Sequence, residues 1–333
     1  MRASRTREPI VILASLALAL TPIAALAQRP DAPAPTYPSK PIRLVSSTTV
    51  GGQPDTIARL IAQKMSEHWG RPVIMDNRPG GGGVLANGVV AKAAPDGHTL
   101  LYVLPNFVIT PALQSGANPD AFKDFVGISQ VGISTNVLVV TAALNVKTVK
   151  DFIALVKTQP GKLIYGSGAS GTAGHLSGAR FGLIAGIKSI HVAYKGGPDA
   201  VIEILGGRSH YTVSTMGVSL PFIKEGKLTP LAVTSVQRAP VLPDVPTLGE
   251  IQPEFKRPET SHGLVAPVGT PRAIISAINK ETARVLDLPD IREKLQGISF
   301  VSAPTTPEAY DKILREQLAT VSKLVTDIGM RAK

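Results

Sequence analysis

The chain has 333 residues with a formal net charge of +11, and it contains no cysteine. The absence of cysteine excludes disulfides, thiol catalysis and a lipid-modified N-terminal Cys. The six histidines are isolated in the sequence, which argues against a metal site. Lys and Arg are scattered and only 5% of residues are aromatic, so no basic helix or stacking platform indicates a nucleic-acid partner. A chain of this length can bury a large core and usually divides into two lobes.

The first residues are typical of a secretory signal peptide. Three arginines precede an apolar run over residues 10–20, and Ala-Leu-Ala at 25–27 offers a small-x-small cleavage site. We expect cleavage after Ala27, so that residues 1–27 form the signal peptide and the mature protein works in the periplasm. The apolar run is shorter than the roughly 20 residues of a membrane span. Residues 28–36 hold three prolines and are predicted to be a disordered leader.

Glycine-containing turns follow or precede three short apolar runs near the start of the mature chain. The runs and turns are 42–46 with Gly51 and Gly52, 72–76 with the four glycines 80–83, and 99–103 after Pro95-Asp96-Gly97. A strand, a glycine turn and a helix in succession direct free backbone N–H groups and the positive end of the helix dipole beyond the sheet edge. The first two turns therefore predict an anion site made from main chain. Such turns also occur wherever strands meet helices tightly, and neither has the spacing of a P-loop or a dinucleotide fingerprint.

Helical and strand patterns alternate along the rest of the chain, which predicts α/β layers. Strands are predicted at 137–140, 163–165, 189–192 and 228–234, and helices at 148–157, 175–184 and 199–205. Two further helices, 270–286 and 306–327, each begin with Thr-Pro, which places Pro at the first helical position after a capping hydroxyl. The proline-rich segments 240–246 and 253–258 suit crossings between lobes.

Residues 166–174 form a turn rich in glycine and hydroxyl groups. A serine hydrolase needs Gly-x-Ser-x-Gly around its nucleophile, and Ser170 lacks this spacing. His175 is near enough in sequence to be considered as a base for Ser170, but sequence neighbours rarely give the required geometry. We expect no enzymatic activity, and a secreted hydrolase using Ser170 and His175 stays open as an alternative.

Several short motifs follow one another in register from the first strand to the last helix. They include Asn77-Arg78-Pro79-Gly80, Pro95-Asp96-Gly97-His98-Thr99, Tyr194-Lys195-Gly196 and Leu242-Pro243-Asp244-Val245-Pro246-Thr247. In this order they resemble the substrate-binding proteins of tripartite tricarboxylate transporters, the Bug family. The resemblance covers nearly all of residues 37–330.

The resemblance implies an α/β fold of the type II periplasmic-binding-protein class, with two lobes and a central ligand cleft. One lobe would comprise residues 37–137 and 260–333, and the other residues 138–259. Members of the family hold a carboxylate through main-chain groups and hydroxyls and hand it to the permease subunits of a membrane transporter. The expected protein is therefore a monomeric solute-binding protein without a cofactor. A periplasmic sensor partner of a signalling receptor is a further alternative.

The expected ligand-binding residues lie in the glycine turns, the hydroxyl-rich turn and the segment around Lys195. They are Thr49, Gly51, Gly52, Asp55, Gly82, Gly83, Asn106, Ser167, Ser170, Thr172, Tyr194, Lys195 and Ser214. Asp55 is expected to cap its helix rather than touch the ligand, and Tyr194 and Lys195 to close the distal end of the pocket.

Two departures from the family pattern bear on the solute. Residues 208–214 lack the Phe-Asp that commonly ends this segment in relatives, which argues against an amino-acid-like solute because its ammonium would want a carboxylate partner. Ser261 replaces a common Trp, which suggests a roomier pocket or rim. We expect an acidic solute without an amino group, such as a di- or tricarboxylate or an aromatic acid.

Overall fold

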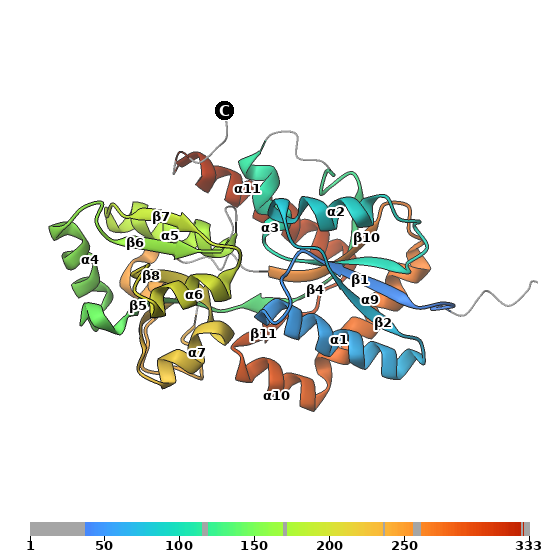
Figure 1. The fold of residues 1–333 in the computed structure, drawn as a ribbon. Coiled ribbons are helices and arrows are strands. Elements are labelled where there is room, and N and C mark those ends of the chain that lie inside the picture. Colours follow the sequence, from blue (N-terminus) through green and yellow to red (C-terminus); the bar gives the residue numbers. More distant parts are fainter. Residues whose placement is uncertain are drawn as a thin grey trace, which may run out of the picture. The chain divides into compact units, whose positions relative to one another are not determined.

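The computed structural model describes six segments of the chain, namely residues 37–114, 119–168, 172–235, 237–255, 261–327 and 329. The predicted signal peptide, the leader and Ser170 lie outside the described residues. The described chain contains two β-sheets, each covered by helices on both faces (Figure 1). None of the described helices is long and apolar enough to cross a bilayer.

The first sheet has six strands in the order β11-β4-β10-β3-β1-β2. Their bounds are β1 Ile42–Ser46, β2 Val73–Asn77, β3 Thr99–Val103, β4 Phe125–Ser134, β10 Ser261–Pro267 and β11 Phe300–Ser302. Strand β1 pairs in parallel with β2 and β3, whereas β10 is antiparallel to both β3 and β4. Because the three N-terminal strands run in parallel, their carboxyl ends, and the turns that follow them, lie at one edge of the sheet.

Seven helical segments accompany the first sheet. They are α1 Gln53–Trp69, η1 Gly81–Gly83, α2 Val84–Ala91, α3 Asn106–Leu113, α9 Arg272–Asp287, α10 Pro289–Gly297 and α11 Pro307–Asp327. Helices α1, α9 and α10 share one apolar cluster with the sheet, and α2, α3 and α11 share another. Burial of apolar surface on both faces is what holds the sheet and its helices together. We call this sheet with its helices the first half.

The second sheet has five strands in the order β7-β6-β8-β5-β9. Its strands are β5 Asn136–Thr141, β6 Ile164–Ser167, β7 Ile190–Ala193, β8 Tyr211–Thr215 and β9 Leu228–Val233. Its helices are η2 Ala142–Leu144, α4 Val149–Thr158, α5 Ala173–Ala185, α6 Gly197–Leu205, α7 Met216–Lys224, α8 Leu248–Ile251 and η3 Pro253–Phe255. Helices α4 and α5 contribute to one apolar cluster of this sheet, and α6 and α7 to the other. We call this sheet with its helices the second half.

Thr135 links the two halves, because β4 ends at Ser134 and β5 begins at Asn136. The N–H of Thr135 donates to the carbonyl of Ser299 at 3.1 Å, and its own carbonyl accepts from the N–H of Met216 at 3.0 Å. At this crossing, the one residue between β4 and β5 is therefore hydrogen-bonded to the segment just after α10 on one side and to the start of α7 on the other.

Most predicted elements are present, often within one or two residues of the expected bounds. The hydroxyl of Thr148 caps α4 by accepting from the N–H of Asp151, as predicted. The Thr-Pro start of α11 is also confirmed, since Thr306 Oγ1 accepts from the N–H of Ala309. The corresponding prediction for α9 is wrong, because this helix begins at Arg272 and the Thr270 hydroxyl donates to Pro267 O instead.

Candidate functional site

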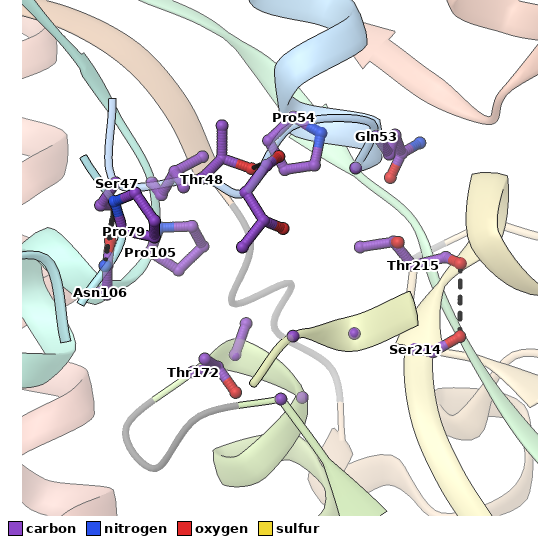
Figure 2. Close-up of a pocket in the computed structure, with 18 of the residues that line it drawn as sticks. Ser47, Thr48, Gln53, Pro54, Pro79, Pro105, Asn106, Thr172, Ser214 and Thr215 are labelled. Carbon is purple, nitrogen blue, oxygen red and sulfur yellow. Dashed lines mark hydrogen bonds between the residues drawn. The ribbon is translucent and has the colours of Figure 1, made fainter. Parts of the chain in front are cut away.

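A pocket of about 260 Å³ is lined by residues from both halves (Figure 2). From the first half it is lined by Ser47, Thr48, Thr49, Gly52, Gln53, Pro54, Pro79, Gly80, Gly81, Gly82, Gly83, Leu104, Pro105, Asn106, Ser134 and His262. From the second half it is lined by Asn136, Gly168, Thr172, Ala173, Gly174, Lys195, Gly196, Gly197, Pro198, Thr212, Val213, Ser214, Thr215 and Val218. Its size suits a small organic molecule.

Six helices begin at this pocket, three from each half. Helices α1, α2 and α3 begin beside the turns that follow β1, β2 and β3, and α5, α6 and α7 begin beside the lining residues of the second half. Of these six helices only α5 has a side-chain cap among the described residues, from Thr172, and no side chain caps α1, α2, α3, α6 or α7. Uncapped helix starts present backbone N–H groups and the positive end of the dipole. The arrangement therefore creates a main-chain environment that favours an anion.

The turn between β1 and α1 is held by Asp55, which is 2% exposed. Its carboxylate accepts from the N–H of Gly51 at 3.0 Å, from the amide of Asn77 at 2.9 Å and from Arg59 Nε at 2.9 Å. The Asn77 amide also donates to the carbonyl of Thr48 at 3.2 Å. Asp55 therefore fixes the first turn from behind and ties it to the end of β2.

Hydrogen bonding decides the protonation of Asp55. Burial by itself raises the pKa of this carboxyl, but the bonds from Arg59, Gly51 and Asn77 outweigh burial and the pKa ends below its usual value. Asp55 is thus a carboxylate that accepts from three groups, and it is absent from the pocket lining. Its role is therefore to hold the first turn in its conformation.

The second turn depends on glycine. Gly82 has φ +61° and Gly83 has φ +97°, a region that other residues rarely adopt. A β-carbon at Gly82 would lie 2.8 Å from Thr110 Oγ1, and one at Gly83 would lie 2.6 Å from Asn106 Nδ2. The hydroxyl of Thr110 donates to the carbonyl of Gly82 at 2.6 Å. Missing side chains thus let the turn pack directly on α3.

Asn106 connects the first turn to α3. Its amide Nδ2 donates to Ser47 Oγ at 3.0 Å, and Figure 2 shows this pair on the left wall of the pocket. The three turns that follow the parallel strands of the first half are therefore joined by side-chain bonds. A rigid set of turns keeps its N–H groups oriented before a ligand arrives, which lowers the entropic cost of binding.

The two halves approach each other at two glycines. Gly196 directly precedes α6, and a β-carbon there would lie 3.5 Å from Thr49 Oγ1. A β-carbon at Gly217, in the first turn of α7, would lie 3.3 Å from Cγ of Gln53. Larger side chains at either glycine would hold the halves apart.

Among the described lining residues, Lys195 is the only one with a formal charge at neutral pH. His262 is 2% exposed, and burial lowers its pKa to about 3, so it is neutral. Its ring nitrogens lie 3.0 Å from Tyr102 OH and 2.8 Å from Ser134 Oγ. No Asp or Glu is among the described lining residues. The pocket therefore combines helix starts, hydroxyls and one cation.

The pocket brings together eight of the residues expected from the sequence. These are Thr49, Gly52, Gly82, Gly83, Asn106, Thr172, Lys195 and Ser214. Thr172 Oγ1 also caps α5, accepting from the N–H of His175 at 3.3 Å.

Four expected residues lie outside the pocket lining. Gly51 and Asp55 lie behind the first turn, where they bond each other. The Ser167 hydroxyl lies 2.8 Å from His191 Nε2, and the Tyr194 hydroxyl lies 2.8 Å from Ser209 Oγ. Ser170 is outside the described residues.

The sequence did not identify four polar residues of the pocket lining, namely Gln53, Ser134, Asn136 and His262. These four come from α1, β4, β5 and β10, and only the folded sheets place them together. Ser261, which replaces a common Trp, is 3% exposed, accepts from Gln130 Nε2 at 3.2 Å and is absent from the lining. The expectation of a roomier rim therefore gains no support from Ser261.

His175 stacks on His191 with ring centroids 4.0 Å apart and an interplanar angle of 6°. Burial, and secondarily the neighbouring His191, lower the pKa of His175 to about 4. His175 is only 8% exposed and is absent from the pocket lining. This placement gives no support to His175 as a catalytic base for a pocket ligand.

Comparison with known proteins is decisive for the family. Residues 57–330 match the family described as tripartite tricarboxylate transporter family receptor. The chain belongs to this family. Members of this receptor family are binding proteins of transporters and not enzymes, so the hydrolase alternative is wrong. The predicted resemblance to the Bug proteins and the predicted two-lobed α/β fold are confirmed.

Curated relatives of this receptor are similar over nearly the whole chain. A UPF0065 protein in the tcbD-tcbE intergenic region of Pseudomonas sp. (strain P51) is 33% identical, over 96% of this chain and 95% of its own length. Protein BugT of Bordetella pertussis (strain Tohama I) is 30% identical, over 90% of this chain and 93% of its own length.

Solved structures of relatives have the same fold. Rpa4515 of R. palustris with adipate has a TM-score of 0.84 and 31% identity, covering 88% of this receptor and 98% of that chain. MatC (Rpa3494) from Rhodopseudomonas palustris with bound malate has a TM-score of 0.79 and 27% identity, covering 87% and 100%.

Proposed function

We propose that this receptor captures a small organic carboxylate in the periplasm for a tripartite tricarboxylate transporter. The observation that carries the proposal is the convergence of six helix starts on a pocket whose described lining contains Lys195 and no carboxylate. Backbone N–H groups, hydroxyls and one ammonium all stabilise a negative charge. An ammonium group on the solute would find no carboxylate partner among these residues.

Both halves contribute helix starts, which favours a solute with a negative group at each end. Helices α1, α2 and α3 face the pocket from one side and α5, α6 and α7 from the other. A dicarboxylate places one carboxylate against each set. Rpa4515 with adipate and MatC with malate are related structures that hold dicarboxylic acids, and this similarity supports the same ligand class here.

The remaining parts of the proposal concern export and partners. We propose cleavage after Ala27, a leader at 28–36, and two lobes close to those expected, residues 37–137 with 260–333 and residues 138–259, with the first boundary moved to Thr135 because β5 begins at Asn136. The two lobes close on the solute, and the monomeric closed form delivers it to the permease subunits in the membrane.

Isothermal titration calorimetry and thermal shift test the ligand class. Succinate, adipate, malate, citrate and benzoate would be titrated into the mature protein, with glutamate and choline as amino and cationic controls. A bound acid raises the melting temperature by mass action. Binding of at least one acid, with neither control bound, supports the proposal.

Absence of binding by every acid, or tighter binding of choline, would contradict it. Uptake of the bound acid by cells that carry the cognate permease separates transport from sensing. Binding without uptake would favour the sensor role.

A further inference from the structure

Gln53 is the first residue of α1 and lines the pocket, yet its side chain is 5% exposed and only half satisfied. Its Nε2 donates to the carbonyl of Ile298 at 2.7 Å. Its Oε1 is shielded from solvent and has no hydrogen-bond partner among the described residues. A buried acceptor without a donor is costly.

The bond to Ile298 fixes which end of the Gln53 amide is left over. Exchange of the amide nitrogen and oxygen would place Oε1 against the Ile298 carbonyl, and two acceptors cannot form a hydrogen bond. The unsatisfied atom is therefore the oxygen. Only a donor can satisfy it.

The start of α7, by contrast, has hydrogen-bond donors that lack an acceptor. The N–H of Met216 donates to Thr135 O at 3.0 Å, but Thr215 offers no side-chain cap. The N–H groups of Gly217 and Val218 have no hydrogen-bond partner among the described residues. An α-helix leaves its first N–H groups free unless an outside acceptor binds them.

The Gln53 amide and the free N–H groups of α7 are adjacent. A β-carbon on Gly217 would lie 3.3 Å from Cγ and 3.4 Å from Cδ of Gln53, so the amide packs directly on the first turn of α7. Figure 2 shows Gln53 and Thr215 on the same side of the pocket. An acceptor without donors in the first half thus meets donors without an acceptor in the second half.

We propose that Gln53 caps α7 from across the pocket when the two halves close on a ligand. In the closed form Oε1 accepts from the N–H of Gly217 or Val218, while Nε2 stays on Ile298. Gln53 is then a positioning residue that holds the closed complex without touching the solute. The inference rests on the proposed function, because closure on a bound carboxylate supplies the movement.

The Gln53 cap predicts a slower release of ligand. The bond forms after the solute has entered, so its loss raises the dissociation rate and leaves the association rate unchanged. For one hydrogen bond to a helix start we expect release to become about five- to tenfold faster. A β-carbon at Gly217 would lie 3.3 Å from Gln53 Cγ, so a side chain there would require the Gln53 amide to shift.

The test measures backbone-amide hydrogen exchange of Gly217 and Val218 by NMR, together with stopped-flow release of adipate and malate. Gln53→Met keeps the shape but removes both the acceptor and the bond to Ile298, whereas Gln53→Glu loses the bond to Ile298 and keeps an acceptor. Gln63→Met is the matched control, because Gln63 is exposed on the same helix and bonds Glu67. Gly217→Ala perturbs the same contact from the other half.

With adipate or malate bound, we expect at least one of the two amides to exchange tenfold faster in Gln53→Met than in the wild type. Protection should persist in Gln53→Glu and Gln63→Met. Unchanged protection and release in Gln53→Met, with binding intact, would overturn the Gln53 cap and leave the proposed function standing. Loss of all acid binding by the wild type would instead overturn the proposed function, and the cap with it.

Discussion

Gly82→Ala is the substitution for which the structure gives the clearest magnitude. Gly82 has φ +61°, and an L-residue in this left-handed region costs about 1–2 kcal/mol. The new β-carbon would also lie 2.8 Å from Thr110 Oγ1, which donates to the Gly82 carbonyl. Loss of that bond costs about 1 kcal/mol. We therefore expect the free energy of unfolding to fall by about 2–3 kcal/mol.

Gly52→Ala is the matched control in the neighbouring turn. Gly52 has φ −72°, which any residue adopts, and a β-carbon there would lie no closer than 3.5 Å to another group. Its stability should change by less than about 1 kcal/mol, since alanine also reduces the freedom of the unfolded chain. The two glycines look alike in the sequence, so only their backbone geometry separates the predictions.

Urea unfolding followed by circular dichroism measures both variants, with equal m-values as the check on two-state behaviour. Thr110→Ala removes both the overlap and the hydroxyl bond, so adding Gly82→Ala to Thr110→Ala should cost only the backbone strain of about 1–2 kcal/mol. Equal stability of Gly82→Ala and Gly52→Ala would refute the reasoning. It would mean that the turn rearranges freely and is not a rigid part of the site.

Three further predictions concern charge. Asp55→Asn should destabilise the protein by about 1.5–3 kcal/mol at neutral pH. Because the folded pKa of Asp55 is lowered, this loss of stability should be constant above about pH 4 and disappear as the pH falls further. Urea unfolding at each pH measures it. Lys195→Met should weaken acid binding by up to about fivefold and flatten its salt dependence in calorimetry, whereas Lys188→Met, exposed in the same half, should change neither. Burial lowers the pKa of His175 to about 4, so between about pH 6.5 and 4 the unfolded chain binds a proton that the folded chain does not, and stability should fall as the pH drops through this range. In thermal unfolding, His175→Gln should show a smaller fall. An unchanged pH profile would contradict the assigned burial.

Capping residues in the sequence were sufficient to predict where some helices begin. The hydroxyls of Thr148 and Thr306 stand before helical patterns and do cap α4 and α11. Strand β4, by contrast, was not predicted, because Phe125–Ser134 mixes glycine, serine and glutamine with its apolar residues. Nearly all of it is buried between β10, β11 and their helices, and such burial depends on partners far away in the chain.

The helix starts at Thr270 and Asp55 show how local rules fail. Thr270-Pro271 has the pattern of a cap, but the Thr270 hydroxyl bonds Pro267 O and the helix begins later. Asp55 was expected to cap its helix, and its carboxylate instead accepts from Gly51, just before the helix, and from Asn77 of β2. In both cases a nearby acceptor or donor competes with the predicted partner, and the sequence does not show which one wins.

By itself, the sequence determined the α/β layers, the glycine turns and the main-chain anion site they predict, because each rests on residues within one short segment. The tertiary structure alone decided that six helix starts meet at one pocket and that Gln53 lies against Gly217. Gln53 and Gly217 are more than 160 positions apart, and the meeting of the helix starts follows from sheet order and packing between the halves, which no local pattern encodes.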